Sequence, residues 1–272
     1  MPLTVMTYNI KTGGGDRLDA ITRVIAGQRP DILAAQELRS FDRDNGRLLR
    51  RLADGTGMRP FLARSLLGQP VAVLVREPVP VRSAGRIRRP FHHAAQRVVV
   101  GTDRGELAMI GAHLSPYWGW WRQREARWLA ARTDPARMAL VLGDLNTLDP
   151  WTEHAERLRR LPAEFRSRHV LRGGHGQVDS RAIRTLAAAG FVDLFRTTRA
   201  DGRIDAGEKD YTAPTEHGGG REFSGMRLDY ILGTPPVAAL TRQCTIISGG
   251  DAEHASDHYP VVAVLDLDAG PA

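Results

Sequence analysis

Apolar positions along the chain follow two different periods, and the change between them predicts where strands and helices lie. Residues 3–8 and 32–36 form short apolar runs that are typical of buried strands. Between them the apolar residues recur at the helical period of 3.6, after Asp16 as a predicted helix cap. These residues are Leu18, Ile21, Val24 and Ile25. We expect this helix to end at Pro30, which has no backbone N–H to continue it.

Beyond residue 60 short strands predominate over helices. Further helices are predicted at 46–53, 122–132 and 180–189, and a hairpin turn at 102–105. The other predicted strands are 61–63, 71–75, 79–83, 97–101, 107–114, 138–142, 227–232, 244–247 and 260–267. Many strands with few helices between them favour antiparallel or mixed sheets with helices outside. Residues 172–177 and 212–225 are rich in glycine, proline and histidine and are predicted surface loops.

Size and composition limit the class of protein. A chain of 272 residues fits one large domain or two small ones, and its 42% hydrophobic content is ample for a core. No segment approaches the ~18 apolar residues of a transmembrane span, and no secretory signal pattern stands at the N-terminus. The single cysteine, Cys244, allows no internal disulfide and is expected to be buried. We therefore expect a cytoplasmic protein, and a monomer.

The chain is basic, with a formal net charge of +7 and a sequence pI of about 10.2. Two arginine clusters supply much of the local charge. The first contains Arg82, Arg86, Arg88, Arg89 and Arg97, and the second Arg157, Arg159, Arg160, Arg166, Arg168 and Arg172. This balance indicates a polyanionic partner such as nucleic acid or an anionic lipid surface. A solvated, arginine-rich surface without a partner is the alternative for either cluster.

Polar residues stand at the ends of several apolar runs. Asn9 and Glu37 close the first two predicted strands, and Gly143-Asp144-Leu145-Asn146 closes the strand at 138–142. Asp257-His258 immediately precedes the strand at 260–267. Acids, amides and imidazoles collected at strand ends are typical of a hydrolytic metal site rather than a core.

These residue types match the needs of phosphate-ester hydrolysis, which requires a divalent cation, a positioned water and donors to the phosphoryl oxygens. Glu37 and Asp257 supply carboxylates of the kind that Mg²⁺ prefers. Asn9 and Asn146 offer amides that bind phosphate or metal. Asp144 is suited to orient a water.

Imidazoles complete the set. His113 and His258 offer donors near neutral pH, and Asp229 is an acid able to hold an imidazole in one tautomer. The adjacent pair His92-His93 is interpreted as part of a solvated loop.

The ordered motifs resemble the endonuclease/exonuclease/phosphatase superfamily, which includes pancreatic-type deoxyribonuclease, exonuclease III, apurinic endonucleases, neutral sphingomyelinases and inositol polyphosphate 5-phosphatases. The resemblance runs from Tyr8 to Val261. It is carried by Tyr8-Asn9-Ile10, Gln36-Glu37-Leu38, Ala112-His113-Leu114, Gly143-Asp144-Leu145-Asn146, Arg227-Leu228-Asp229-Tyr230 and Ser256-Asp257-His258-Tyr259-Pro260-Val261. Each motif is weak alone, and their common order makes the resemblance specific.

The resemblance implies an α/β (α+β) four-layer sandwich, in which two packed mixed β-sheets are flanked by helices, as a single catalytic domain over residues 1–272. It implies a site at one edge of the sheets. Glu37 would be the principal Mg²⁺ ligand, with Asp257 and Asn9 at or near the ion and Mn²⁺ as the alternative metal.

The resemblance also implies roles for the other residues. Asn146 would bind phosphate, and His113 would contact the phosphate or assist the leaving group. His258, paired with Asp229, would stabilise the transition state or share in activating the water. The general base is either Asp144 or the Asp229–His258 pair.

Two positions depart from the apurinic endonucleases. Those enzymes carry an acid where this chain has Lys11, and they usually lack a histidine at the position of His113. Both positions resemble the deoxyribonuclease and sphingomyelinase branches, which counts against abasic-site repair.

The function expected is therefore a Mg²⁺-dependent phosphodiester hydrolase, a nuclease acting on DNA by metal-assisted attack of water on phosphorus. The alternative is a phospholipid phosphodiesterase or a small phosphate-ester phosphatase of the same superfamily. Trp118 and Trp120 closely follow His113 and are expected to be exposed, where they would stack on bases or contact a membrane peripherally. A non-catalytic binding module is disfavoured, because every expected polar position is present.

Overall fold

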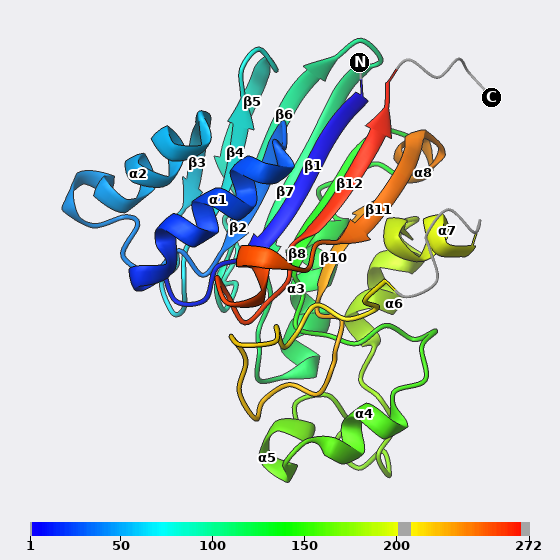
Figure 1. The fold of residues 1–272 in the computed structure, drawn as a ribbon. Helices are drawn as coiled ribbons and strands as arrows, with labels where there is room; N and C mark the ends of the chain where they lie inside the picture. Colours follow the sequence, from blue (N-terminus) through cyan, green and yellow to red (C-terminus); the bar gives the residue numbers. More distant parts are fainter. Residues whose placement is uncertain (1, 201–207, 268–272) are drawn as a thin grey trace.

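The computed structural model describes residues 2–200 and 208–267, which form two sheets packed face to face (Figure 1). The first sheet has the order β11-β12-β1-β2-β4-β3. Its strands are β1 (Pro2–Asn9), β2 (Ile32–Gln36), β3 (Met58–Ala63), β4 (Val71–Arg76), β11 (Thr241–Ile246) and β12 (Val261–Asp266). The parallel pair β1–β2 stands among antiparallel neighbours, so this sheet is mixed.

The second sheet has the order β5-β6-β7-β8-β10-β9. Its strands are β5 (Val81–Arg86), β6 (Ala94–Thr102), β7 (Gly105–His113), β8 (Ala139–Asp144), β9 (Val192–Asp193) and β10 (Asp229–Gly233). Here β7 and β8 are parallel and the other pairs antiparallel. Both sheets are therefore mixed, as expected.

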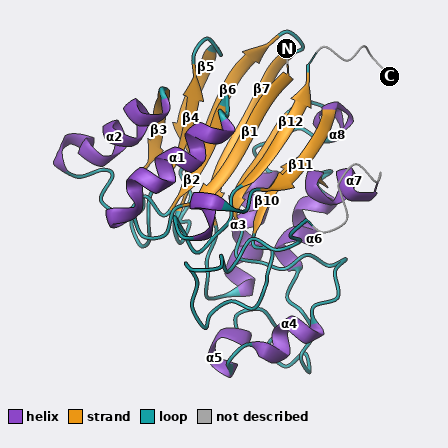
Figure 2. Ribbon diagram, viewed as in Figure 1, coloured by secondary structure: helices purple, strands orange, loops and turns teal. Residues whose placement is uncertain are grey.

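Helices cover the outer faces of the sheets (Figure 2). The helices α1 (Leu18–Gln28) and α2 (Arg47–Thr56) lie over the first sheet, and α3 (Gly119–Ala130) and α6 (Arg181–Ala188) pack on the second. This arrangement confirms the four-layer sandwich. None of the described helices is long and apolar enough to cross a bilayer.

The largest apolar core lies between the two sheets and continues under α1. Gly111 on β7 shows how closely the sheets approach. A methyl group at this position would come within 2.9 Å of Val73 Cγ2 and 3.1 Å of Ala34 Cβ, which both belong to the opposite sheet. Because interiors are close-packed, the sheets fix each other's position and therefore the relative position of their edges. Cys244 is buried in this core, as expected.

Several predicted boundaries were wrong. β5 begins at Val81 rather than 79 and β10 at Asp229 rather than 227, while α3 begins at Gly119 rather than 122. Trp120 consequently belongs to the first turn of α3. The helices α4 (Ala155–Arg160), α5 (Ala163–Arg166), α7 (Leu194–Ala200) and α8 (Pro235–Leu240) were not predicted, because short helices carry little periodic signal.

A buried ion pair holds the loop after β8 against the start of β10. The Arg227 guanidinium donates to both carboxylate oxygens of Asp193 at 3.0 and 2.6 Å, and to Asp149 at 3.3 Å. Asp149 also accepts the backbone N–H groups of Trp151 and Thr152 at 2.9 and 2.8 Å. The ion pair thus connects β9, the loop after β8 and the segment that leads into Asp229.

We predict that Arg227→Met lowers the free energy of unfolding by about 3–5 kcal/mol, because two buried carboxylates would lose their cation. Urea denaturation measures the loss. Arg51→Met is the matched control, since Arg51 forms an exposed pair with Asp19 at 2.7 Å and exposed pairs contribute little. Equal losses in the two variants would contradict a stabilising role for the buried pair.

Candidate active site

The predicted site residues come together at one edge of the sandwich. The parallel strands β1, β2, β7 and β8 end at this edge, and the antiparallel strand β10 begins there. Asn9 at the end of β1 pairs with Gln36 of parallel β2, and His113 at the end of β7 pairs with Asp144 of parallel β8. Asp144 also pairs with Asp229, the first residue of antiparallel β10. This register brings polar residues that are distant in sequence to one edge of the sandwich.

The carboxylate of Asp144 is buried and bonded through both oxygens. Its Oδ2 accepts a hydrogen bond from Asn9 Nδ2 at 3.0 Å and lies 3.3 Å from His113 Nε2 and 4.0 Å from His258 Nε2. Its Oδ1 accepts the backbone N–H of Asn146 at 2.9 Å. Burial acts to raise the pKa of Asp144, but the charges of His113 and His258 hold it well below its ordinary value. Asp144 is therefore an anion at neutral pH.

The backbone around the site uses conformations that few residues adopt. Gly143 has a φ of 146°, and a Cβ there would stand 1.9 Å from the carbonyl oxygen of Ala112. Only glycine fits this position directly before Asp144. Glu37 and Asn146 have φ values of 59° and 49°. Such strained residues concentrate at functional sites, where packing holds them.

Glu37 is held by hydrogen bonds from three directions. Its Oε1 accepts from Asn9 Nδ2 at 3.2 Å, while its Oε2 accepts from the Thr12 backbone N–H at 2.7 Å and from Gln69 Nε2 at 2.9 Å. Burial acts to raise the pKa of the Glu37 carboxyl, but the charge of His113 and the Thr12 N–H hold it below its ordinary value. Glu37 therefore presents an ionised carboxylate to the site.

Asp257 already lies beside a cation. The Lys11 ammonium stands 3.3 Å from its Oδ2 and donates to the carbonyl oxygen of Gly218 at 2.6 Å. The adjacent Ser256 donates to the backbone carbonyl of Asn9 at 2.6 Å, which ties the Asp257 loop to the end of β1. Carboxylate and carbonyl oxygens are thus arranged around a positive charge at this point.

His258 and Asp229 form a buried pair. The Nδ1 of His258 donates to Asp229 Oδ2 at 2.7 Å. Burial acts to lower the pKa of His258, but the carboxylate of Asp229 outweighs it and raises the pKa well above its ordinary value. The imidazole is therefore cationic at neutral pH. Oδ1 of Asp229 has no hydrogen-bond partner within the described residues.

His113 is the second imidazole beside Asp144, which raises its pKa against the effect of burial and so favours its protonated form. Its ring stacks on His93 with centroids 3.8 Å apart. The interpretation of His93 as a solvated loop residue was wrong: it is 8% exposed, and its Nδ1 accepts the backbone N–H of Gln69 at 2.9 Å. Burial and the charge of His113 lower the pKa of His93, so His93 is neutral.

These groups open onto a pocket of about 290 Å³. Six of the eight predicted site residues line it, namely Glu37, His113, Asp144, Asn146, Asp257 and His258. Asn9 and Asp229 lie behind them, bonded to Asp144 and His258 respectively. Lys11, Gln69, His93 and Arg168 also line the pocket and were not predicted as site residues. Trp118 and Trp120 are 54% and 55% exposed, as expected.

Two groups of residues are candidates for binding a metal ion. Asp144, Asp229 and His258 offer ligand atoms within 4.8 Å of one another and are buried. However, His258 already donates its Nδ1 proton to Asp229. Glu37, Asp257 and Asn9 offer only oxygen ligands next to the pocket, and Lys11 marks a position that favours positive charge. The second group fits a hard divalent cation better.

Glu125 on α3 positions the loops around the imidazoles. Its carboxylate accepts the backbone N–H groups of His92 at 2.7 Å and Ser115 at 2.8 Å. These residues adjoin the segments that carry His93 and His113. Burial raises the pKa of the Glu125 carboxyl to about 7.

The model of the Endonuclease/Exonuclease/phosphatase family matches residues 6–258. No curated protein matches the chain. An AP endonuclease from Archaeoglobus fulgidus is similar in structure, with a TM-score of 0.65, 23% identity and coverage of 97% of this chain and 100% of the other.

Two further structures are similar at lower identity. An endonuclease/exonuclease/phosphatase from Bacteroides vulgatus has a TM-score of 0.69 and 18% identity, over 98% of this chain and 100% of its own. TDP2 of D. rerio, solved with a single-strand DNA product, has a TM-score of 0.67 and 14% identity, over 97% and 99%. At these identities the structural likeness concerns the fold.

Glu125 predicts a pH effect on stability. Its pKa is about 7 when folded against 4.5 as its ordinary value, so the folded protein holds the extra proton between these values. The associated stability is complete below about pH 4.5 and is lost as the pH rises to about 7. Relative to Glu125→Gln, the wild type should lose about 3 kcal/mol of unfolding free energy between pH 4.5 and 8. Denaturant titrations of both proteins measure this, and parallel pH profiles would contradict it.

Proposed function

Because the chain belongs to the endonuclease/exonuclease/phosphatase family, we propose that it is a Mg²⁺-dependent phosphodiesterase that cleaves nucleic acid, with DNA as the preferred substrate. The proposal is carried by the geometry around the buried carboxylate of Asp144, which lies 3.3 Å from His113 Nε2 and 4.0 Å from His258 Nε2. The carboxylates of Glu37 and Asp257 line the same pocket and offer oxygen ligands for a metal. Phosphoryl transfer needs this combination of negative ligands for a metal and positive donors for phosphate oxygens.

Glu37 would hold the ion, with Asp257 and Asn9 at or near it and Mn²⁺ as the alternative metal. When bound, the ion would neutralise charge on the phosphate and polarise the phosphorus–oxygen bonds. Lys11 would leave Asp257 for a phosphate oxygen or for solvent as the ion enters, because two cations at one carboxylate repel each other.

Asp144 is the better candidate for the general base. It is an anion, whereas His258 is already protonated and has no free lone pair to accept another proton. Asp144 would orient the attacking water through its carboxylate and take its proton. His258, held by Asp229, would then donate to the phosphoryl oxygens as negative charge develops in the transition state.

His113 and Asn146 complete the contacts with the substrate. Asn146 Nδ2 donates to the carbonyl of Leu114 at 3.1 Å, and we assign its amide to a phosphate oxygen in the complex. His113, cationic and backed by Asp144, would contact the phosphate or protonate the leaving oxygen. The neutral ring of His93 keeps His113 in place by stacking.

A phospholipid phosphodiesterase or small phosphate-ester phosphatase is the second candidate. The exposed Trp118 and Trp120 favour a lipid surface, since tryptophan side chains concentrate at membrane interfaces. The net charge of +7 fits DNA or an anionic membrane. A screen with Mg²⁺ or Mn²⁺ over plasmid DNA, single strands, RNA, sphingomyelin and a chromogenic phosphodiester separates the candidates.

We predict that Glu37→Gln raises the Mg²⁺ concentration for half-maximal activity by about tenfold or more, because each tenfold corresponds to ~1.4 kcal/mol of binding. Calorimetric titration with Mn²⁺ gives an independent measurement of the same loss. Glu164→Gln, an exposed change on α5, is the control and should match wild type. Full activity of Glu37→Gln in limiting Mg²⁺ would remove Glu37 from the metal site.

We also predict that His258→Ala and Asp229→Ala each cost on the order of 10²-fold or more in kcat, the range for positioned acid–base groups. Because the two residues act as a unit, the double variant should lose much less than the product of the two single losses. Single-turnover rates on one defined oligonucleotide test this. Strictly multiplicative losses would show that the two residues act independently.

A further inference from the structure

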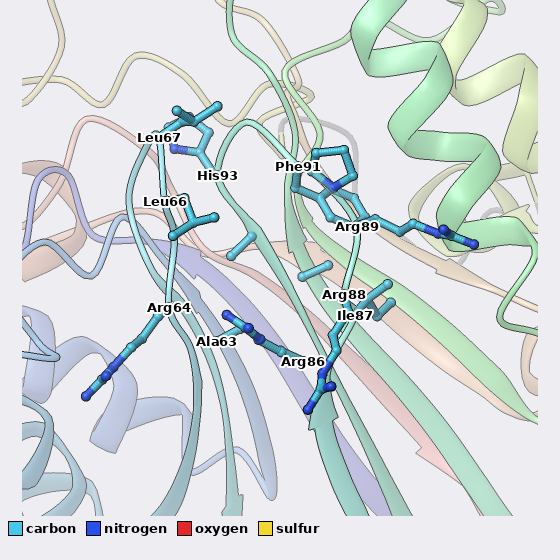
Figure 3. A pocket seen from close by; sticks show the side chains of 13 residues that line it. Ala63, Arg64, Leu66, Leu67, Arg86, Ile87, Arg88, Arg89, Phe91 and His93 are labelled. Atoms are coloured by element: carbon cyan, nitrogen blue, oxygen red, sulfur yellow. The ribbon is translucent and has the colours of Figure 1, made fainter.

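A second hollow adjoins the catalytic pocket. It has a volume of about 430 Å³, lies between the loop after β3 and the segment after β5, and shares His93 with the catalytic pocket. In Figure 3, Leu66, Leu67 and His93 stand on one side of this hollow, and Arg88, Arg89 and Phe91 on the other. A ligand bound at the catalytic pocket could therefore extend past His93 into it.

The lining combines apolar surface with positive charge. Ile87 and Phe91 are 8% and 4% exposed and form part of the floor, while Leu66 at the rim is 93% exposed. Arg64, Arg86, Arg88 and Arg89 surround the floor, and none of the acidic residues that the structure describes lines the hollow. Arg64 stands 3.9 Å from Asp42. Arg86 and Arg88 form no ion pair within the part of the chain that the structure describes.

The hollow continues along the outer face of the second sheet. The next depression, of about 400 Å³, shares Arg86 and Arg88 with the first and adds Arg97 and Arg132. A third, of about 560 Å³, shares Arg97 and Arg132 with the second. We name this series of three depressions the arginine groove. Two acids line only its far end, Glu106 and Asp134, and Asp134 is paired with Arg137 at 3.8 Å.

The other arginine cluster has no such continuity. Arg159 and Arg160 both pair with Glu156, and Arg157 pairs with Asp210 at 2.7 Å. Two acids therefore partly neutralise these three arginines, whereas Arg166, Arg168 and Arg172 form no ion pair among the described residues, and Arg168 lines the catalytic pocket. Of the two clusters predicted from the sequence, the first supplies the arginines of the groove, and its charges are available to a ligand.

The length of the groove indicates the size of its ligand. The stretch of β6 from Ala95 to Val99 borders it from the first depression to the third, about 14 Å at ~3.4 Å per strand residue. In a duplex each strand carries a phosphate about every 3.4 Å of helix axis, and a single strand that keeps this stacking has the same spacing. The groove could therefore follow about four phosphates, which is more than a small ester or a single lipid headgroup has.

The apolar floor favours a single strand over a duplex. Bases in a duplex are stacked inside, whereas unpaired bases can lie on apolar and aromatic side chains such as Phe91 while arginines contact the backbone. We propose that the arginine groove binds a single nucleic-acid strand that continues from the scissile phosphate past His93. This inference rests on the proposed function for the identity of the scissile bond, and the groove itself is testable without catalysis.

Binding is measured by fluorescence anisotropy with labelled oligo(dT) of increasing length, in EDTA so that no metal-dependent cleavage occurs. For wild type we expect affinity to rise with length until the groove is filled, and a log–log salt slope near −3, at about −0.7 per single-strand phosphate. A slope shallower than about −1, or tighter binding to a duplex of equal length, would overturn the proposal. Because this measurement uses only the wild-type protein, its result does not depend on whether a variant folds.

Two triple variants with the same change of charge locate the strand. Arg86→Ser/Arg88→Ser/Arg97→Ser should weaken binding by about tenfold or more and reduce the salt slope by about 2. Arg157→Ser/Arg159→Ser/Arg160→Ser should stay within about twofold of wild type. Equal losses of strand affinity in the two variants would indicate a non-specific effect of charge and would overturn the proposal that the strand binds in the groove. Thermal unfolding of each variant establishes that it is folded.

Two further measurements separate this proposal from the alternatives. Hydrolysis of a small chromogenic phosphodiester should be the same in both triple variants, because it requires only the catalytic pocket. Strand binding without hydrolysis of any phosphodiester would contradict the proposed function and leave the groove supported. Cosedimentation with phosphatidylglycerol vesicles that depends on Arg86, Arg88 and Arg97, without strand binding, would overturn the proposal in favour of a membrane surface.

Discussion

The backbone register at Asp144 is the constraint on which the rest of the site depends. This residue pairs with His113 across the parallel β7–β8 ladder and with Asp229 across the antiparallel β8–β10 ladder. A one-residue slip in either ladder would turn its side chain to the opposite face of the sheet. Gly143 permits the sharp backbone conformation before Asp144, since any Cβ would collide with Ala112. The two sheets then meet through the hydrogen bond from Asn9 on β1 to Asp144 on β8.

Positive and negative groups alternate around the carboxylate of Asp144. Asp144 is buried, and burial alone would favour its neutral form, so interactions with His113 and His258 are what lower its pKa and favour the ionised form. His258 is in turn kept protonated by Asp229, and the stacked His93 adds no charge beside His113. Under the proposed function, this arrangement of charges would already be in place when charge moves during the reaction, which is the physical basis of electrostatic catalysis.

The sequence allowed the polar residues at the strand ends to be predicted, but not all of the side-chain contacts around them. Asn9, Glu37, Asp144 and Asp257 follow or precede apolar runs, so their position at a sheet edge could be deduced without coordinates. Arg227 and Asp149 could not be paired, because their contact depends on how distant loops pack. His93 was misinterpreted although a signal existed. The hairpin turn at 102–105 pairs Thr102 with Gly105, and counting back along the same register pairs Ala94 with His113, which places His93 beside the site.

The arginines show why charge counted along a sequence does not identify a binding surface. Arg157, Arg159 and Arg160 form as dense a cluster as Arg86, Arg88 and Arg89, yet their acids come from Glu156 on the same helix and from the distant Asp210. Ion pairing of this kind depends on tertiary structure, so the net charge of +7 is unevenly distributed over the surface.

The groove beside His93 has few acids because it is formed by β5, β6 and the turn after α3, whose exposed positions are mainly arginine and small residues. If the proposed function holds, the arginines beside the catalytic pocket would attract a long polyanion and hold it across the scissile bond, since phosphate contacts outside the site position the substrate without taking part in the chemistry.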